Sequence, residues 1–206
     1  MIVASNQKPV TGNQKKKQTG RIFVLSAPSG CGKTTLLKKL LNDKDLNLIH
    51  SISMTSRPPR EDEKNGVDYF FVSEKAFREK IKKGEFLEWE EIFGNLYGTP
   101  REFVERSLAC GKNIIFSIDV KGAMSIRGAY PKDSTLVFIL PPSLEELEER
   151  LKKRRTDESY VISNRLKIAK DEMSYKNRYD YSVVNDNLAN AYDKLKEIIS
   201  KHGIHL

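Results

Sequence analysis

The chain has 206 residues, enough for one domain with a sizeable hydrophobic core, and it combines 31% charged residues with a mean hydropathy of −0.54. This composition, interrupted by several short apolar runs, is typical of a soluble globular protein and excludes both a disordered chain and a bundle of membrane helices. The N-terminus lacks the apolar core of a secretory signal, so we expect a cytoplasmic protein with no membrane partner.

The net charge of +8 is concentrated at the N-terminus, where residues 1–21 contain five basic residues and no acidic one. Gln, Asn, Lys and Gly dominate this segment, so we expect residues 1–20 to form a disordered basic tail. An RNA-binding arm is the alternative. The remaining basic excess favours a site for phosphorylated nucleotides, and we predict no specific nucleic-acid partner.

Residues 25–35, LSAPSGCGKTT, predict a phosphate-binding loop between a strand and a helix. β-Branched and aromatic residues favour a strand over 21–25, and leucines at helical spacing favour a helix over 34–41. Gly30 and Gly32 allow backbone N–H groups to turn inward, Lys33 can reach the β- and γ-phosphates, and the Thr34 hydroxyl can bind Mg²⁺. A plain strand-to-helix turn is the alternative.

We therefore predict an ATP site formed by one continuous segment: Ala27, Pro28, Ser29, Gly30, Cys31, Gly32, Lys33, Thr34 and Thr35. Ala27 replaces the first glycine of the usual motif, a mild change where the backbone φ is negative. The two cysteines, Cys31 and Cys110, fit no disulfide or metal spacing, so we expect both to be reduced. An easily oxidised thiol of low pKa is an alternative for Cys31.

The next segments alternate between short strands and polar loops. Residues 47–53 and 67–72 predict strands, and residues 54–61 predict a loop that carries two arginines, because its prolines exclude a helix. Ser73 is a predicted N-cap of a helix that ends near Gly84. Residues 86–93 are apolar but contain three glutamates, an unusual density for such a segment, and we expect Trp89 to be a core residue.

A turn is predicted over 95–98, and Thr99 begins a capping box for a helix that ends at Gly111. The apolar runs 113–118 and 135–140 predict buried parallel strands. Asp119 follows the first of them, where carboxylates face the ligand crevice. A short helix lies between these runs.

The last third of the chain predicts two charged helices, the first opened by a capping box at residues 143–146 and the second over 160–175. A strand over 181–184 and an amphipathic C-terminal helix follow. Strands and helices thus alternate, which predicts an α/β fold with a parallel sheet of about five strands flanked by helices.

The sequence from about residue 21 to its C-terminus resembles the guanylate kinase family. Four segments occur in that family's order and spacing: SMTSRPPR at 53–60, GVDYFF at 66–71, EFLEW at 85–89 and NLYGT at 95–99. The resemblance implies a P-loop NTPase three-layer fold with one guanylate kinase-like domain over residues 21–206. It further implies three parts: a core (21–52, 101–142 and 168–206), a mixed α+β GMP-binding insert (53–100) and a helical lid (143–167).

The resemblance implies an ATP:GMP phosphotransferase that converts Mg-ATP and GMP to ADP and GDP, and so supplies and recycles GDP and GTP. Its substrates would be ATP and GMP, with dGMP as a further acceptor, and the chain would be a monomer or a weak homodimer. Because the attacking phosphate oxygen of GMP is already anionic, in-line transfer requires no general base.

The resemblance also implies roles for individual residues. It assigns the GMP phosphate to Arg57, Arg60, Tyr69 and Tyr97, which suits guanidinium and phenol donors. It assigns guanine to Glu88 and Ser53, with Thr99 and Asp119 near the base or its phosphate. A carboxylate accepts the N1–H and N2–H₂ donors of guanine and is left unpaired by adenine.

The catalytic cations implied by the family are Lys33, Arg57, Arg150, Arg154 and Arg165, and the metal ligands are Thr34 and Asp119. Two positions depart from the family's pattern. Ser117 stands where an acidic residue is common, and Arg155 stands where glycine is common.

Two other functions fit parts of this pattern. A guanylate kinase-like interaction domain keeps the fold to bind partner peptides, but such domains usually lose parts of the ATP site that this chain retains. A kinase of ribose phosphates on a similar scaffold would not need Glu88 together with Tyr69 and Tyr97.

Overall fold

The computed structural model describes residues 19–92, 94–153 and 159–204. Of the expected basic tail, only Thr19 and Gly20 belong to these residues. Among the helices that are described, none is long and apolar enough to cross a membrane.

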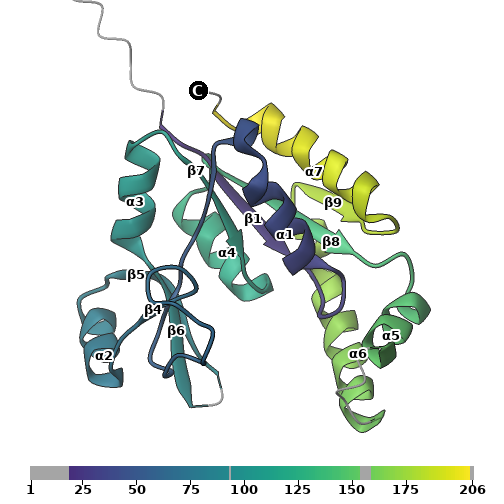
Figure 1. Ribbon diagram of the computed structural model, residues 1–206, viewed down its shortest axis with the longest axis horizontal. Helices are drawn as coiled ribbons and strands as arrows, with labels where there is room; N and C mark the ends of the chain where they lie inside the picture. The colour runs from purple at the N-terminus through teal and green to yellow at the C-terminus, as the bar shows by residue number, and fades with distance from the viewer. Residues whose placement is uncertain (1–18, 93, 154–158, 205–206) are drawn as a thin grey trace, which may run out of the picture.

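A parallel sheet of five strands forms the centre of the molecule (Figure 1). Its strands lie in the order β2-β7-β1-β8-β9, and every neighbouring pair is parallel. The strands are β1 (Ile22–Ser26), β2 (Leu48–His50), β7 (Asn113–Ser117), β8 (Ser134–Leu140) and β9 (Tyr181–Val184). The predicted α/β fold with a five-stranded parallel sheet is confirmed.

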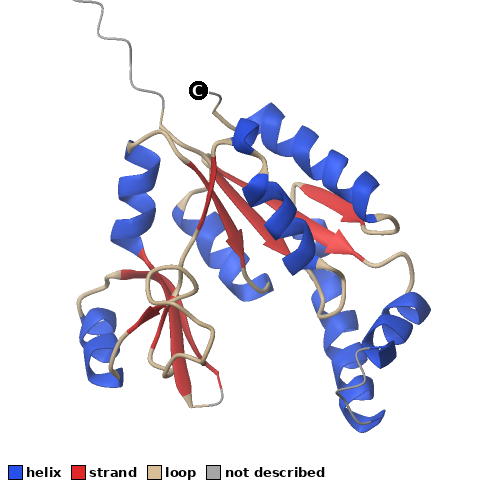
Figure 2. Cartoon of the chain, viewed as in Figure 1, coloured by secondary structure: helices blue, strands red, loops and turns tan. Residues whose placement is uncertain are grey.

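Helices cover both faces of this sheet, because successive side chains of a strand point to opposite faces. Phe23 and Leu25 of β1 pack into one core cluster with α1 (Lys33–Asn42) and α7 (Leu188–His202). Ile22 and Val24 pack into a second cluster with α3 (Arg101–Ala109) and α4 (Val120–Ala129). The molecule therefore has three layers, with helices on either side of a buried sheet (Figure 2).

Two further units project from the end of the sheet where β1 stops (Figure 1). One is a four-stranded sheet, β4-β3-β6-β5, with helix α2 (Glu74–Lys82). Its strands are β3 (Met54–Thr55), β4 (Phe70–Phe71), β5 (Phe86–Ile92) and β6 (Asn95–Pro100). The other unit is a pair of helices, α5 (Leu144–Lys153) and α6 (Ser159–Ser174).

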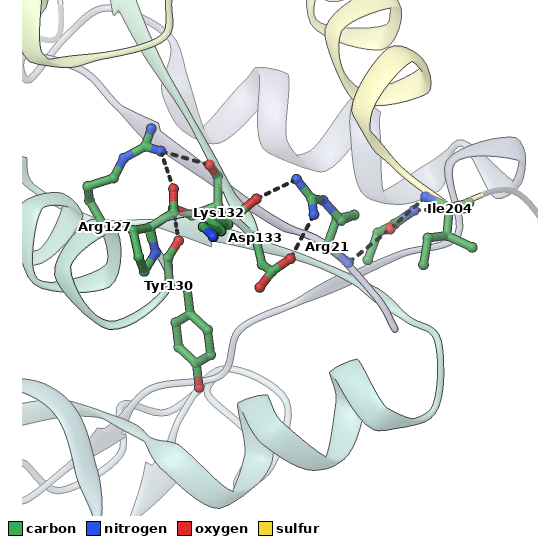
Figure 3. A network of polar contacts seen from close by, with 9 residues as sticks. Arg21, Arg127, Tyr130, Lys132, Asp133 and Ile204 are labelled. Carbon is green, nitrogen blue, oxygen red and sulfur yellow. Dashed lines mark hydrogen bonds and ion pairs between the residues drawn. The ribbon is translucent and has the colours of Figure 1, made fainter. Parts of the chain in front are cut away.

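The opposite end of the sheet is fastened by a polar network (Figure 3). The Arg21 guanidinium donates to Oδ1 of Asp133 and to the carbonyl of Lys132, both at 2.8 Å. The Asn113 side chain exchanges two hydrogen bonds with the Ile204 backbone, at 2.9 and 3.0 Å. These contacts join β1, β7, β8 and the chain's C-terminal segment, and they leave the carboxyl ends of the strands open to ligands.

Several local predictions were wrong in the smaller sheet. The strand predicted over 67–72 is limited to Phe70 and Phe71, because the preceding segment turns with Val67 and Asp68 both donating to the Lys64 carbonyl. The loop predicted over 54–61 begins with the short strand β3. In the central sheet, the strand predicted over 47–53 shortens to β2.

The segment predicted as a turn over 95–98 is instead part of β6, which pairs antiparallel with β5. Gly94, with φ +74°, lies just before it, and Asn95 is already opposite Ile92 in the ladder. The capping box predicted at Thr99 is also wrong. Pro100 is the N-cap of α3 and makes no side-chain cap bond, while Thr99 is a buried residue of β6.

Trp89 was predicted to lie in the core, but its side chain is 47% exposed on β5. Near this point β5 alternates between half-buried residues, Glu88 and Glu90, and exposed ones, Trp89 and Glu91, which apolar composition alone does not reveal.

Candidate functional site

The phosphate-binding loop joins β1 to α1 as predicted. Gly30 and Gly32 have φ values of +96° and +82°, which only glycine adopts without strain, and Gly32 is the N-cap of α1. Ala27 does not have a positive φ and so does not need to be glycine. Among the described residues, Asn47 is the only non-glycine residue with a positive φ. The loop therefore presents a helix N-terminus and its N–H groups to an anion.

A cavity of about 390 Å³ lies over this loop. All of the predicted ATP-site residues, 27–35, line it together with Asp119 and three residues of α6. The three residues are Arg165, Ile168 and Glu172. Their spacing of three and four positions puts them on one face of the helix, so α6 forms a wall of the cavity.

Asn185, which directly follows β9, supports the phosphate-binding loop through a hydrogen bond. Its buried side-chain amide donates to the Cys31 carbonyl at 2.8 Å. A Cβ on Gly32 would lie 2.5 Å from the same amide nitrogen, so the close approach itself requires glycine there. The loop is thus held in shape by the protein's own contacts.

Lys33 lies at the floor of the cavity, where Nζ donates to the Ile118 carbonyl at 3.3 Å. Burial lowers the pKa of Lys33, and the charges of Glu172 and then Asp119 oppose that change. The ammonium group is therefore stabilised by two carboxylates that line the same cavity. Glu172 was missed by the sequence analysis, although its position seven residues after Arg165 on one helix face was a usable signal.

Asp119 both caps a helix and lines the loop cavity. Its Oδ1 accepts a hydrogen bond of 2.8 Å from the Gly122 backbone N–H, which makes Asp119 the N-cap of α4. The residue also lines the loop cavity, as its place after a parallel strand predicts. One carboxylate oxygen is thus committed to the helix, and the side chain still faces the ligand crevice.

A second group of predicted residues gathers in the smaller sheet. The Arg57 guanidinium lies over the rings of Tyr69 and Phe71, at 5.6 and 5.8 Å from their centroids. Tyr69 and Tyr97 meet edge to face with centroids 6.0 Å apart. Burial raises the pKa of Tyr69, so its phenol stays neutral and able to donate. The cluster presents one guanidinium and two phenols at the same place.

Glu63 belongs to this cluster and was also missed. Its two carboxylate oxygens accept hydrogen bonds from Nη2 of Arg57 at 2.8 and 2.9 Å. Oε2 also accepts from the Arg60 backbone N–H at 2.8 Å. The contact with Glu63 raises the pKa of Arg57 above its usual range, so the guanidinium is charged throughout.

Glu88 and Thr99 form the part of the site predicted to read the base. The Thr99 hydroxyl donates to Oε1 of Glu88 at 2.5 Å across strands β6 and β5. Burial raises the pKa of Glu88, the Thr99 hydrogen bond opposes that, and the Asp119 charge raises it further. Ser53 lies just before β3, half-buried, with its carbonyl accepting from the Phe70 N–H at 2.9 Å.

Two of the predicted lid arginines belong to the described residues. Arg165 lines the loop cavity, whereas Arg150 donates to Oε1 of Glu146 at 3.0 Å and to the Asn185 carbonyl at 3.1 Å. Arg154 and Arg155 lie outside the described residues. Ser117 is half-buried at the end of β7.

The proposed alternative of a reactive Cys31 is contradicted. The side chain has no exposed surface, and burial raises the pKa of its thiol to about 12. Both cysteines are free thiols, and Cys110 is the exposed one.

Comparison with known proteins decides the family. The model of the family described as guanylate kinase matches residues 19–202. The chain belongs to the guanylate kinase family. The phosphate loop, the parallel sheet and the inserted smaller sheet are thus the parts of a P-loop NTPase fold, as the sequence predicts.

Relatives and a solved structure agree over nearly the whole guanylate kinase domain. The chain is 46% identical to a guanylate kinase of Malacoplasma penetrans, covering 90% of this chain and 95% of the relative. It is 49% identical to one of Nitrosomonas europaea, covering 86% and 88%. A crystal structure of guanylate kinase from Anaplasma phagocytophilum superposes with a TM-score of 0.71 at 35% identity, covering 91% of this chain and 88% of that one.

Proposed function

We propose that the protein transfers the γ-phosphoryl group of ATP to GMP, giving ADP and GDP. The observation that carries the proposal is the place of Asp119 between two sites. Its side chain lines the phosphate-loop cavity, and its charge acts on Glu88 of the smaller sheet. An ATP molecule in the cavity and a GMP molecule at Glu88 would therefore both lie close to the Asp119 carboxylate. Direct transfer between two nucleotides requires such closeness.

The donor site is the cavity over residues 27–35. Backbone N–H groups of the loop and the α1 N-terminus bind the ATP phosphates, and Lys33 neutralises charge on the β- and γ-phosphates. Lys33 is already aimed at this cavity by its bond to the Ile118 carbonyl. Arg165 also lines this cavity, where it can approach the transferring group.

The acceptor site binds the phosphate of GMP through Arg57, Arg60, Tyr69 and Tyr97. The guanidinium stacked on aromatic rings supplies a planar set of donors for phosphate oxygens, and the phenols add neutral donors. Phosphate recognition at this cluster would place the nucleotide's base toward Glu88.

Guanine is selected by Glu88 with Ser53 and Thr99. A carboxylate accepts the N1–H and N2–H₂ groups of guanine together, whereas adenine offers no proton at N1 and would leave the buried carboxylate unpaired. Thr99 supports this role because its hydroxyl fixes one oxygen of Glu88. The same contacts would accept dGMP, since they do not involve the ribose.

Magnesium suits the donor site. The Thr34 hydroxyl and the Asp119 carboxylate both line the loop cavity, and these are oxygen ligands of the kind that Mg²⁺ prefers. The described residues contain no group of three or more His, Cys, Asp or Glu side chains that could hold a metal alone, so the phosphates of ATP would complete the ligand set. When bound, Mg²⁺ supplies neutralising charge at the phosphate oxygens.

Transfer requires no general base, because the attacking oxygen of GMP is anionic. Lys33 and Arg57 hold the two phosphates in line, and the lid arginines Arg150, Arg154 and Arg165 stabilise charge on the γ-phosphoryl group. Arg150 is bound to Glu146 and the Asn185 carbonyl, so closure of the lid must exchange these contacts for phosphate. Closure would also exclude water and suppress ATP hydrolysis.

The domain divides into three functional parts in this mechanism. Core residues 21–52, 101–142 and 168–206 bind ATP, the insert 53–100 binds GMP, and residues 143–167 form the lid. We further propose that the enzyme works in the cytoplasm as a monomer or weak homodimer. Sedimentation across a range of protein concentrations tests the oligomeric state.

The acceptor preference tests the proposed function. ADP release from Mg-ATP is measured with GMP, dGMP, AMP, CMP or UMP as the acceptor. We expect rapid release with GMP and with dGMP, and little with the others. Equal inactivity with all five acceptors would exclude the enzyme and leave a guanylate kinase-like interaction domain.

A further inference from the structure

Glu63 carries a carboxylate into the acceptor site that binds neither base nor phosphate in the proposed function. It lies in the loop between β3 and β4, and its side chain is only 15% exposed, as is that of Arg57. A carboxylate so close to an anion-binding cluster opposes the binding of a dianionic phosphate unless it has a compensating role.

The hydrogen bonds of Glu63 join the two arginines of the cluster. Its carboxylate accepts from Nη2 of Arg57 with both oxygens and from the backbone N–H of Arg60 with Oε2. Its own N–H donates to the Arg60 carbonyl at 3.1 Å, which closes the loop into a turn. A single side chain thus fixes the Arg57 guanidinium and the backbone that carries Arg60.

Arg57 keeps donors for a phosphate while it is bound in this way. Glu63 occupies Nη2, and the Pro58 carbonyl accepts from Nη1 at 2.7 Å. Nη1 carries a second N–H and Nε carries another, so the planar group can bind Glu63 and phosphate together. The rings of Tyr69 and Phe71 confine its plane.

The balance of charge between Glu63 and the two arginines also allows the cluster to bind a phosphate. The ion pair cancels the Glu63 charge against that of Arg57, and Arg60 adds a further cation to the loop. Fixing a long arginine side chain before the ligand arrives also removes the loss of rotamer freedom that binding would otherwise cause. We expect preorganisation to outweigh repulsion at this site.

We propose that Glu63 is a positioning residue of the acceptor site, which holds Arg57 and Arg60 ready to receive the phosphate of the nucleoside monophosphate. The proposal rests on the proposed function for the identity of that acceptor. Two effects of removing Glu63 have opposite signs: loss of positioning raises the KM for GMP, whereas relief of repulsion lowers it.

The experiment compares Glu63→Ala and Glu63→Gln with Glu61→Gln, an exposed glutamate two positions earlier in the same loop. KM for GMP, KM for ATP and kcat are measured for each, with thermal unfolding as a check on folding. We expect Glu63→Ala to raise the KM for GMP by about tenfold or more, with the KM for ATP within about twofold of wild type. Glu63→Gln keeps a hydrogen-bond acceptor but loses the charge, so its KM for GMP should lie between those of wild type and Glu63→Ala. Glu61→Gln should have the wild-type KM for GMP.

A double-mutant comparison separates positioning from a general effect on the fold. If Glu63 acts through Arg57, adding Glu63→Gln to Arg57→Ala should change the KM for GMP much less than it does in the wild-type background. An unchanged or lowered KM for GMP in folded Glu63→Gln, or full additivity with Arg57→Ala, would overturn the proposal. Wild-type protein without any GMP-dependent activity would instead overturn the proposed function on which it rests.

Discussion

The Thr99 hydroxyl donates a 2.5 Å hydrogen bond to Oε1 of Glu88 across the antiparallel strands β6 and β5. Thr99 is fully buried, so the bond is shielded from water and fixes the orientation of the carboxylate. One oxygen of Glu88 is thereby occupied by a donor from the protein. In the proposed function, the remaining lone pairs define what kind of base edge the site accepts.

Replacing Glu88 by Ala should relax the preference for guanine. Without the carboxylate, the N1–H and N2–H₂ groups of guanine lose their acceptor, and adenine no longer leaves a buried charge unpaired. We expect the ratio of kcat/KM for GMP over AMP to fall by at least about 100-fold. Glu90→Gln is the matched control, because Glu90 lies on the same strand but pairs with Lys121. An unchanged ratio in Glu88→Ala would remove Glu88 from the site.

Acidification should weaken GMP binding through the same carboxylate. Burial raises the pKa of Glu88 above its usual range, so the group loses its charge at a higher pH than an exposed glutamate does. The KM for GMP should then rise as the pH falls through that raised pKa. Thr99→Val removes a hydrogen bond that lowers this pKa and should move the rise in KM to higher pH. KM measured against pH for both proteins checks the direction, and a shift to lower pH would contradict it.

Lys33→Ala should abolish most of the turnover and leave acceptor binding nearly intact. In the proposed mechanism, the ammonium group neutralises charge that develops on the transferring phosphoryl group, so its loss acts on kcat. We expect kcat to fall by at least about 100-fold while the affinity for GMP changes by less than about threefold. Lys38, exposed on the same helix, provides the control Lys38→Ala. Near-normal turnover in Lys33→Ala would be incompatible with the mechanism.

Glu172→Gln should separate activity from stability. Burial raises the pKa of Glu172 and the Lys33 charge opposes that change, so the cost of burying the carboxylate offsets its attraction to Lys33 and a neutral amide should change the melting temperature little. Loss of the carboxylate whose charge acts most strongly on Lys33 should lower kcat by about tenfold. Asp171→Asn, at an exposed neighbouring position, is the control. A fall in melting temperature with unchanged kcat would make Glu172 a structural residue.

The two thiols should differ strongly in reactivity. Cys110 is exposed, whereas Cys31 is buried and its thiol has a pKa of about 12, so little thiolate forms at neutral pH. Titration of native protein with a chromogenic disulfide should show one fast thiol, and Cys110→Ser should remove it. A fast reaction that persists in Cys110→Ser would mean that the phosphate loop opens to solvent.

The phosphate loop and the central strands were predictable because their signals are local. Glycines at fixed spacing before Lys33 define the loop, and continuous apolar runs such as 113–118 define strands buried on both faces. Asp119 was predicted by the same logic, from its place after such a strand. The sequence did not predict that Asp119 also caps α4, through its hydrogen bond with the Gly122 N–H.

The smaller sheet was harder to predict because its strands are short and its polar side chains serve tertiary contacts. The residues around Thr99 read as a helix cap, yet the hydroxyl bonds to Glu88 on another strand. Glu63 carried no motif that separated it from its acidic neighbours, since only the folded loop brings it to Arg57. Trp89 was misplaced because an exposed strand face follows from pairing, which sequence composition does not contain.

The fate of the γ-phosphoryl group tests the central claim most directly. ATP labelled at the γ-phosphate is incubated with Mg²⁺, GMP and the protein, and the products are separated. We predict that the label appears as the β-phosphate of GDP, with little free phosphate, because in the proposed mechanism the two nucleotide sites meet at Asp119. Label released only as inorganic phosphate, with GMP unchanged, would contradict direct transfer between the two sites.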